Sequence, residues 1–252
     1  MVIMNKPISL VERCDNMEFM SKFPDKFFDL AVPDPWYGIG ATEMQMGHFP
    51  NRKGKLSYPS ESTAVKLKKG RLNSGGGSMK NSCLVNTHFE DKAPSPDFFK
   101  ELFRVSKHQI IWGGNYFDLP PTRGIICWDK LQPWDNFSQW EMAWTSFDCP
   151  AKIFRFSNTG GRNHEVKIHP TQKPVQLYSW LFKTFAKHGF KILDTNLGSQ
   201  SSRIAAFSQR LDFYGCEIDN KIFSDGCERF EKKCHGIIKV EDKTIVQQSL
   251  FQ

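Results

Sequence analysis

Residues 191–217 read KILDTNLGSQSSRIAAFSQRLDFYGCE, and this stretch decides the fold. It predicts, in order, a strand over 191–193, a loop over 195–199, a helix over 201–209 and a strand over 213–216. A strand, a helix and a second strand in this order are typical of the crossover unit of a parallel sheet. The sequence therefore predicts an α/β protein.

Two acidic residues follow the two predicted strands, Asp194 after the first and Glu217 after the second. Gly198 lets the backbone approach a ligand closely, and the N-terminus of the following helix presents free N–H groups. An acid after the second strand suits the two hydroxyls of a ribose. Because the loop holds one glycine rather than a GxGxxG set, it disfavours a nicotinamide dinucleotide. An ordinary crossover with a capping aspartate and serine remains the alternative.

A second stretch, Asp34-Pro35-Trp36-Tyr37, follows the apolar run Phe28–Val32. The run predicts a buried strand that delivers Asp34 into a loop at its carboxyl end, where open α/β sheets bind ligands. Pro35 restricts the backbone of that loop. A proline-rich turn with buried aromatic side chains is the alternative interpretation.

A third stretch, His169-Pro170-Thr171-Gln172-Lys173-Pro174, precedes a helix predicted over 174–186. We expect Thr171 and Gln172 to cap this helix and Lys173 to reach an anion. A plain helix-entry loop is the alternative.

Apolar spacing between the second and third stretches predicts four more elements. They are a helix over 96–105 and strands over 108–112, 124–128 and 141–147.

Together, the three stretches resemble the amino-methyltransferases of DNA, which methylate adenine N6 or cytosine N4. Asp34–Tyr37 is similar to the family's catalytic motif, Asp/Ser/Asn-Pro-Pro-Tyr/Phe/Trp. His169–Pro174 is similar to the motif beside the methionine part of the cofactor. Asp194–Ser199 and Glu217 are similar to the cofactor loop and the ribose acid. The order, catalytic motif first, is similar to the permuted "beta" class.

The resemblance implies one Rossmann-like methyltransferase domain over residues 1–252, circularly permuted, with a mixed, mostly parallel sheet and helices on both faces. It also implies a reversed hairpin strand at one edge. S-adenosylmethionine is the implied cofactor and double-stranded DNA the implied partner. The candidate catalytic residues are Asp34, Pro35, Trp36 and Tyr37. The candidate cofactor-binding residues are Asp34, Thr171, Lys173, Asp194, Asn196, Gly198, Ser199 and Glu217.

The catalytic tetrapeptide suits an amino group conjugated to a base ring, which is a weak nucleophile. The Asp34 carboxylate and the Pro35 carbonyl can accept its two hydrogens and aim its lone pair. Tyr37 offers a flat face on which an extruded base can stack. Asp at the first position favours adenine N6, and cytosine N4 is the alternative.

Three positions depart from the family pattern. Trp36 stands where a second proline is usual, Thr195-Asn196 replaces a proline or aromatic pair, and Gln200 replaces a second glycine. We expect the Gln200 side chain either to crowd the cofactor or to add a hydrogen bond to it. A DNA-binding protein with impaired methyl transfer is therefore the alternative from another class. The motif order disfavours methylation of RNA or protein.

A polar segment over 41–95 interrupts the apolar pattern and is strongly basic. Residues 41–92 hold nine basic and four acidic residues, so they contribute +5 of the net charge of +7. We interpret the segment as a mobile insertion that contacts DNA phosphates, with a solvated surface loop as the alternative. Its candidate DNA-binding residues are Arg52, Lys53, Lys55, Lys66, Lys68, Lys69 and Arg71.

The cysteine spacing and the lengths of the apolar runs predict the state of the thiols and the location of the protein. The seven cysteines form no CxxC pair, which predicts reduced thiols and no metal site. The apolar runs are too short to span a bilayer, and the first residues lack a signal pattern, so we expect a cytoplasmic protein. A homodimer is left open.

Overall fold

The computed structural model describes residues 7–39, 92–131, 138–157, 167–168, 171–240 and 243–246, and every structural statement below concerns these ranges. Most of the predicted insertion, residues 41–91 with all seven candidate DNA-binding residues, lies outside them. His169 and Pro170 of the third sequence stretch also lie outside. None of the helices within these ranges is long and apolar enough to cross a membrane.

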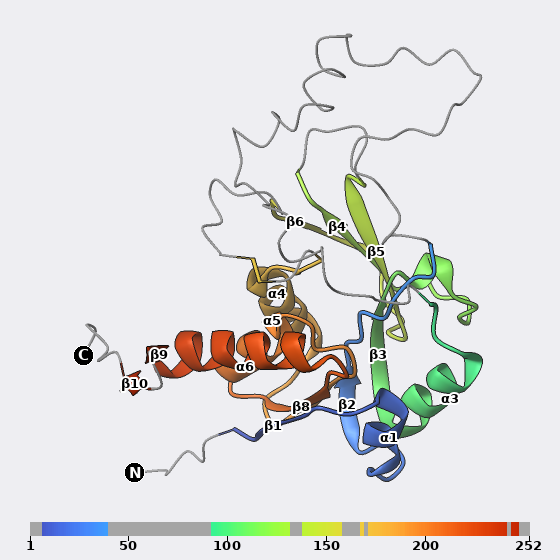
Figure 1. Ribbon diagram of the computed structural model, residues 1–252. Coiled ribbons are helices and arrows are strands. Elements are labelled where there is room, and N and C mark those ends of the chain that lie inside the picture. The colour runs from blue at the N-terminus through green and yellow to red at the C-terminus, as the bar shows by residue number, and fades with distance from the viewer. Residues whose placement is uncertain are drawn as a thin grey trace, which may run out of the picture.

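An eight-stranded sheet forms the centre of the molecule (Figure 1), in the order β1-β8-β7-β2-β3-β5-β4-β6. In this order the strands are β1 (Ser9–Glu12), β8 (Asp212–Cys216), β7 (Lys191–Asp194), β2 (Phe28–Ala31), β3 (Ser106–Trp112), β5 (Trp140–Thr145), β4 (Ile125–Asp129) and β6 (Lys152–Arg155). The first five run parallel, and β5 runs antiparallel to both β3 and β4. The predicted mixed, mostly parallel sheet is confirmed. The expected position of the reversed strand is wrong, because β5 lies inside the sheet between β3 and β4, and the edge strands are β1 and β6.

The strand order reverses between β2 and β7. The chain leaves β2 for β3 on one side and leaves β7 for β8 on the other. The main-chain N–H of Val32, just after β2, donates to the carbonyl of Leu193 in β7 over 2.8 Å. Ligands of open α/β sheets bind at such a switch point, outside the carboxyl ends of the strands. Asp34 and Asp194 therefore flank the expected ligand site.

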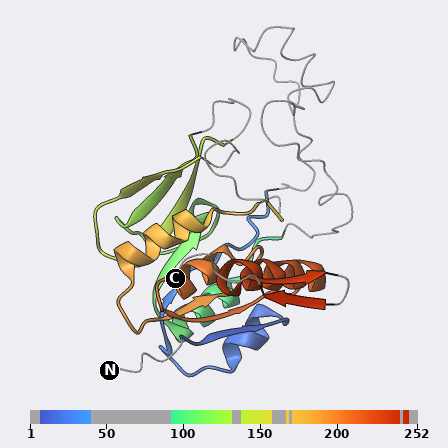
Figure 2. The same cartoon turned by 90° about the vertical axis from the view of Figure 1, so that its left-hand side faces the viewer.

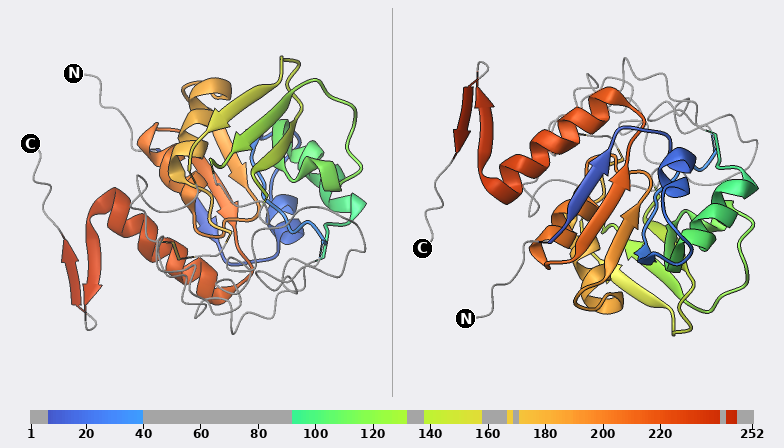
Figure 3. Two further views of the ribbon diagram at one scale, coloured as in Figure 1. Left: turned by 90° about the horizontal axis from the view of Figure 1, so that it is seen from above. Right: turned by 90° about the horizontal axis from the view of Figure 1, so that it is seen from below.

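Helices cover both faces of the sheet, as predicted (Figure 3). One face packs against α1 (Asn16–Ser21) and α3 (Pro96–Val105), and the other against α4 (Val175–Phe185), α5 (Ser201–Ser208) and α6 (Asn220–His235). In α3, the buried side chains Phe98, Phe99, Leu102 and Val105 recur at helical spacing, which is why its bounds are predicted correctly. Figure 2 shows α4 alongside β4–β6, where Trp180 contacts Phe154 with ring centroids 5.2 Å apart.

Several elements have no counterpart in the sequence prediction. They are β1, α1, β6, α6, the short helix η3 (Gly114–Tyr116) and a separate antiparallel pair, β9 (Ile237–Val240) and β10 (Lys243–Val246). The longest, α6, begins after Asp219, whose carboxylate accepts a hydrogen bond from the N–H of Ile222 over 2.8 Å. It ends at Gly236, which has a φ of 65°.

Candidate active site

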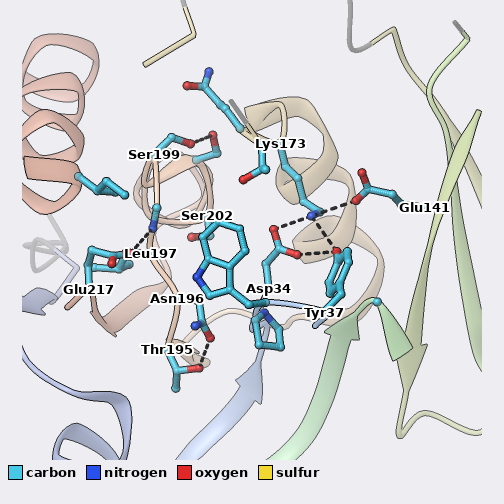
Figure 4. Close-up of a pocket in the computed structure, with 18 of the residues that line it drawn as sticks. Asp34, Tyr37, Glu141, Lys173, Thr195, Asn196, Leu197, Ser199, Ser202 and Glu217 are labelled. Carbon is cyan, nitrogen blue, oxygen red and sulfur yellow. Dashed lines mark hydrogen bonds and ion pairs between the residues drawn. The ribbon is translucent and has the colours of Figure 1, made fainter. Parts of the chain in front are cut away.

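A cavity of about 580 Å³ opens at the carboxyl edge of the sheet (Figure 4). Its lining comes from the segments that follow the parallel strands β1, β2, β3, β7 and β8, and from the loop before α4. The antiparallel strand β5 begins at this edge, so its first residues also reach the cavity. Pro35 and Trp36 line it, together with every predicted cofactor-binding residue except Asp194. Asp194 is buried, and its hydrogen-bond partners Asn196 and Ser202 line the cavity.

The catalytic tetrapeptide is fixed by its neighbours. The N–H of Trp112 donates to the carbonyl of Pro33 over 3.1 Å, which extends the pairing of β2 and β3 into the loop. The Tyr37 hydroxyl donates to Oδ1 of Asp34 over 2.9 Å. A Cβ at Gly113, where φ is 69°, would lie 2.2 Å from the Tyr37 ring, so only glycine leaves room for that ring.

A second tyrosine packs on the first. The rings of Tyr37 and Tyr116 are stacked, with centroids 5.0 Å apart and planes at 21°. Tyr116 belongs to η3, lines the same cavity and is 47% exposed. The flat aromatic surface predicted for Tyr37 is therefore shared with a residue from another segment.

Lys173 lies at the centre of a buried charge cluster. Its Nζ is 2.5 Å from Oδ2 of Asp34 and 3.0 Å from Oε2 of Glu141, a residue of β5. Nζ of Lys130 lies 2.5 Å from the other Glu141 oxygen. Burial disfavours the Lys173 ammonium, but the carboxylates of Asp34 and Glu141 outweigh it and raise the pKa of Lys173.

Glu141 shows the reciprocal effect. Burial alone would raise the pKa of its carboxyl group, but the ammonium groups of Lys173 and Lys130 hold that pKa down to about 2. The Tyr37 hydroxyl has a pKa well above its usual value, because it is buried and lies beside the Asp34 carboxylate. Glu141 and Lys173 are thus both ionised at neutral pH, and Tyr37 stays a hydrogen-bond donor.

The third sequence stretch is only partly as predicted. Pro174 is the N-cap residue of α4 and its side chain forms no capping hydrogen bond. Among the described residues, neither Thr171 nor Gln172 caps this helix, so the predicted capping is wrong. Both side chains lie too far upstream of the first turn. The Gln172 carbonyl oxygen instead accepts from the N–H of Ile168 over 3.1 Å. Lys173 contacts carboxylates of the chain itself, and its contact with a cofactor anion stays a prediction.

Two acids of a different kind lie at the opposite half of the cavity, Glu217 in its lining and Asp194 buried behind it. The buried Asp194 carboxylate accepts from the N–H of Asn196 over 3.0 Å and from the Ser202 hydroxyl over 2.5 Å. Glu217 accepts from the N–H of Gly198 over 2.9 Å and from the N–H of Asp219 over 3.1 Å. Within the described ranges, no lysine or arginine forms an ion pair with either acid.

Burial without a cation changes the proton affinity of these acids. It raises the pKa of Asp194 to about 7 and also raises the pKa of Glu217. Their hydrogen bonds to backbone N–H groups and to Ser202 offset only part of this effect. This half of the cavity is therefore suited to a ligand with hydroxyl groups and positive charge.

The side chain of Gln200 does not enter the cavity. Gln200 has a φ of 59°, the left-handed region in which glycine is favoured, and its side chain is directed away toward α6. Its Oε1 accepts from Nη1 of Arg203 over 2.8 Å, and its Nε2 lies 3.3 Å from the Cys227 sulfur. A Cβ at Gly226 would lie 2.8 Å from the Gln200 Cγ, so a glycine in α6 provides the space. The expectation that Gln200 crowds the cofactor or bonds to it is wrong.

Comparison with known proteins identifies the family. Residues 94–227, more than half of the chain, match the N6/N4 DNA methylase family. The chain belongs to this family. This confirms the resemblance stated from the sequence motifs, although the matched residues begin after the Asp34–Tyr37 tetrapeptide.

Individual relatives of this methylase are distant. It is 24% identical over 94 residues to the type II methyltransferase M.HpaI of Haemophilus parainfluenzae, an alignment that covers 37% of this chain and 30% of that protein. The cytosine-N4-specific PvuII DNA methyltransferase shares the fold, with a TM-score of 0.51, 11% identity and coverage of 88% of this chain and 86% of that one. A putative DNA modification methylase of Thermus thermophilus, complexed with S-adenosyl-L-methionine, gives a TM-score of 0.48 at 15% identity over 91% of this chain and 96% of that one.

Two residues of the methylase site were missed from the sequence, Glu141 and Tyr116. The sequence signal for Glu141 was weak, because Trp140, Met142 and Trp144 form the apolar face of this alternating strand and Glu141 belongs to the other face. The structure shows that the other face is buried as well, since Ala143 and Thr145 are fully buried. A charged side chain on the buried face of a strand requires a partner. Tyr116 gave no comparable signal, because it lies in a short helix outside the apolar pattern.

Proposed function

We propose that this methylase transfers a methyl group from S-adenosylmethionine to the N6 amino group of an adenine in double-stranded DNA. The observation that carries the proposal is that one cavity joins a fixed Asp34–Tyr37 acceptor site to a second, acidic site. In that second site Glu217 lines the cavity, and the buried Asp194 lies directly behind the lining residues Asn196 and Ser202. The methyl donor of this family is S-adenosylmethionine, which agrees with the cofactor predicted from the sequence.

The acidic half of the cavity fits that cofactor. S-adenosylmethionine carries an ammonium and a sulfonium charge, and its ribose presents two hydroxyl groups. Asp194 would hold the positively charged end, and Glu217 would accept the ribose hydroxyls. Asn196, Gly198, Ser199 and Thr171 line the same space. When bound, the cofactor supplies an activated methyl group.

The catalytic half would hold the target amino group. An ionised carboxylate has roughly four lone-pair sites, and Lys173 and Tyr37 use one on each oxygen of Asp34. The remaining lone pairs can accept a hydrogen of the amino group, and the Pro35 carbonyl can accept the other. Because the Lys173 ammonium stabilises the charged carboxylate, Asp34 would orient the amino group rather than remove its proton before transfer.

The choice of adenine rests on Asp34 as the first residue of the tetrapeptide. Cytosine N4 methylation is the alternative, since the PvuII enzyme with the same fold is cytosine-N4-specific. The alternative of a DNA-binding protein with impaired methyl transfer rested in part on Gln200. The side chain of Gln200 points away from the cavity, so this residue no longer supports that alternative. Trp36 lines the cavity and remains a departure from the family pattern.

Methylation-aware sequencing of DNA tests this function directly. The chain is expressed in a host that lacks DNA methylation, with an Asp34→Ala variant as the matched control. We expect N6-methyladenine in one defined sequence context with the natural chain and none with the variant. N4-methylcytosine instead would establish the alternative base. Equal, unmodified DNA in both samples would contradict the proposed function.

The basic residues of 41–91 remain the proposed contact to DNA phosphates. Deleting residues 66–80 removes five of the basic residues in this segment. We expect the deletion to weaken DNA binding and to flatten its dependence on salt, because fewer counterions are released. An unchanged affinity and an unchanged salt slope would reject this role.

A further inference from the structure

Four charged side chains form a continuous chain from the edge of the sheet to the catalytic tetrapeptide. They are Lys130, Glu141, Lys173 and Asp34, joined by separations of 2.5, 3.0 and 2.5 Å. They come from four separate segments: the end of β4, β5, the loop before α4 and the loop after β2. Figure 4 shows the Lys173 ammonium between the carboxylates of Asp34 and Glu141.

Stability alone is a weak explanation for this arrangement. Removing charged groups from water costs several kcal/mol per ion, and apolar residues of similar size often stabilise a core at least as well. The Lys173 side chain is only 4% exposed, and those of Asp34 and Glu141 are 19% and 22% exposed. A buried ion set that ends on the predicted catalytic carboxylate therefore suggests a role in fixing its geometry.

The geometry gives Glu141 a specific effect on Asp34. An ammonium group has three hydrogens to donate, and in this site it faces Asp34 on one side and Glu141 on the other. The ammonium already donates to the Tyr37 oxygen over 3.5 Å. Without Glu141, Asp34 would be the one carboxylate left to attract it within the described ranges. A closer approach of the ammonium to Asp34 would take up lone pairs of this carboxylate that the target amino group needs.

We propose that Glu141 is a positioning residue for methyl transfer: it shares the Lys173 ammonium, and thereby keeps Asp34 oriented and open to the amino group of the target base. The inference rests on the proposed function, since it assigns Asp34 the role of acceptor. Lys130 neutralises the outer oxygen of Glu141 and completes the chain.

The proposal predicts a change in proton affinity as well as in rate. The groups that face Lys173 are Asp34, Tyr37, Glu141 and Tyr178, with the Trp112 ring centroid 5.1 Å from Nζ. Burial works against the ammonium, so its protonation depends on the two carboxylates. Loss of one carboxylate lowers the pKa of Lys173, and the alkaline limb of the kcat profile should move to lower pH.

The experiment compares Glu141→Gln and Glu141→Asp with the natural chain. We expect Glu141→Gln to lower kcat by about 10- to 100-fold with the KM for the cofactor within about twofold, and Glu141→Asp to recover part of the rate. The alkaline limb should move to lower pH in Glu141→Gln. Asp97→Asn serves as the control, because Asp97 forms an exposed ion pair with Lys100 on α3 and should change nothing.

A second readout needs no turnover. An NMR titration of the Lys173 side-chain nitrogen, assigned with Lys173→Arg, should show deprotonation at lower pH in Glu141→Gln than in the natural chain. If Glu141→Gln does not fold, the double variant Lys130→Met, Glu141→Met removes the outer pair without changing the net charge. The same rate loss and titration shift are expected from it.

The outcomes separate the two claims. Two results would overturn the positioning role. The first is a kcat of Glu141→Gln within about twofold of the natural chain. The second is a lower kcat with no change in the alkaline limb of the pH profile or in the Lys173 titration. The second result would instead identify a purely structural residue. A natural chain that methylates neither base would overturn the proposed function as well.

Discussion

Carboxyl groups at the two halves of the cavity differ in their proton affinity. Glu141 is buried beside two lysines and has its pKa held to about 2, whereas Asp194 is buried beside hydrogen-bond donors only and has its pKa raised to about 7. Burial acts in the same direction on both, so the presence of a cation decides the difference. The catalytic half, around Glu141, already contains its counter-charges. The cofactor half, around Asp194 and Glu217, is suited to a ligand that carries positive charge.

The largest expected effect concerns the half with built-in counter-charges. Asp34→Ala should lower kcat by about 10³-fold, because the amino group loses its acceptor and Lys173 loses a partner. Cofactor affinity should change by less than about threefold, because Asp194 and Glu217 are untouched. Single-turnover methylation and calorimetric titration measure the two quantities. Near-normal turnover would show that Asp34 is not the acceptor that holds the target amino group.

The second prediction concerns the stability of the cofactor-free protein. A pKa of about 7 in the folded state lies above that of an unfolded aspartate, so the contribution of Asp194 to stability is present below about pH 4 and lost as pH rises to about 7. Asp194→Asn removes this titration. Above pH 7 the variant should be the more stable by up to about 4 kcal/mol, and the difference should vanish near pH 4.

Thermal unfolding across this pH range measures the Asp194 effect. Added S-adenosylmethionine should stabilise the natural chain more than the variant, because only the carboxylate can pair with a positive charge. A pH-independent difference between the two chains would show that Asp194 is not the group that titrates. Ser202→Ala is a second variant for comparison. It removes a hydroxyl donor to Asp194 and should raise the pKa of Asp194 further without removing the carboxyl group.

A smaller effect is expected from the second acid of the cofactor half. Glu217→Ala should raise the cofactor Kd by about 10- to 100-fold, as expected for lost hydrogen bonds to a charged acceptor. The kcat at saturating cofactor should change little. The Kd for S-adenosylmethionine from calorimetry tests this directly, and an unchanged value would exclude a ribose contact.

The smallest effect tests whether Gln200 belongs to the scaffold behind the cofactor half. Gly226→Ala places a Cβ against Gln200 and should destabilise the fold by about 1–2 kcal/mol. In a Gln200→Gly background the same change should stabilise it by about 1 kcal/mol, because alanine favours the helix. Urea unfolding of the four chains gives the coupling. Equal effects in both backgrounds would mean that the two residues are independent.

Local patterns made much of the fold predictable. The helix α3 and the strands β7 and β8 follow from apolar spacing within single segments. The helix α6 did not, because only Gly226, Arg229 and Phe230 of its 16 residues are buried, and the charged remainder hides the spacing. The edge strands β1 and β6 are four residues long and gave too short a pattern.

The candidate site was predictable where a motif is contiguous. Asp34–Tyr37 and Thr195–Ser199 reach the same cavity, as expected from their positions after β2 and β7. The contact of Lys173 with Glu141 joins segments whose relative placement depends on strand register, which the sequence does not show. The direction of Gln200 follows from a positive φ, and the sequence leaves that sign open.

The four-residue charge chain also bears on how DNA arrives. Two ammonium groups and two carboxylates cancel, so Lys130, Glu141, Lys173 and Asp34 have no net charge. A neutral set has little electrostatic reach beyond the screening distance of about 8 Å in physiological salt. These lysines therefore neither attract a phosphate backbone at long range nor compete for its phosphates. The +7 excess that could steer DNA toward this molecule resides elsewhere in the chain.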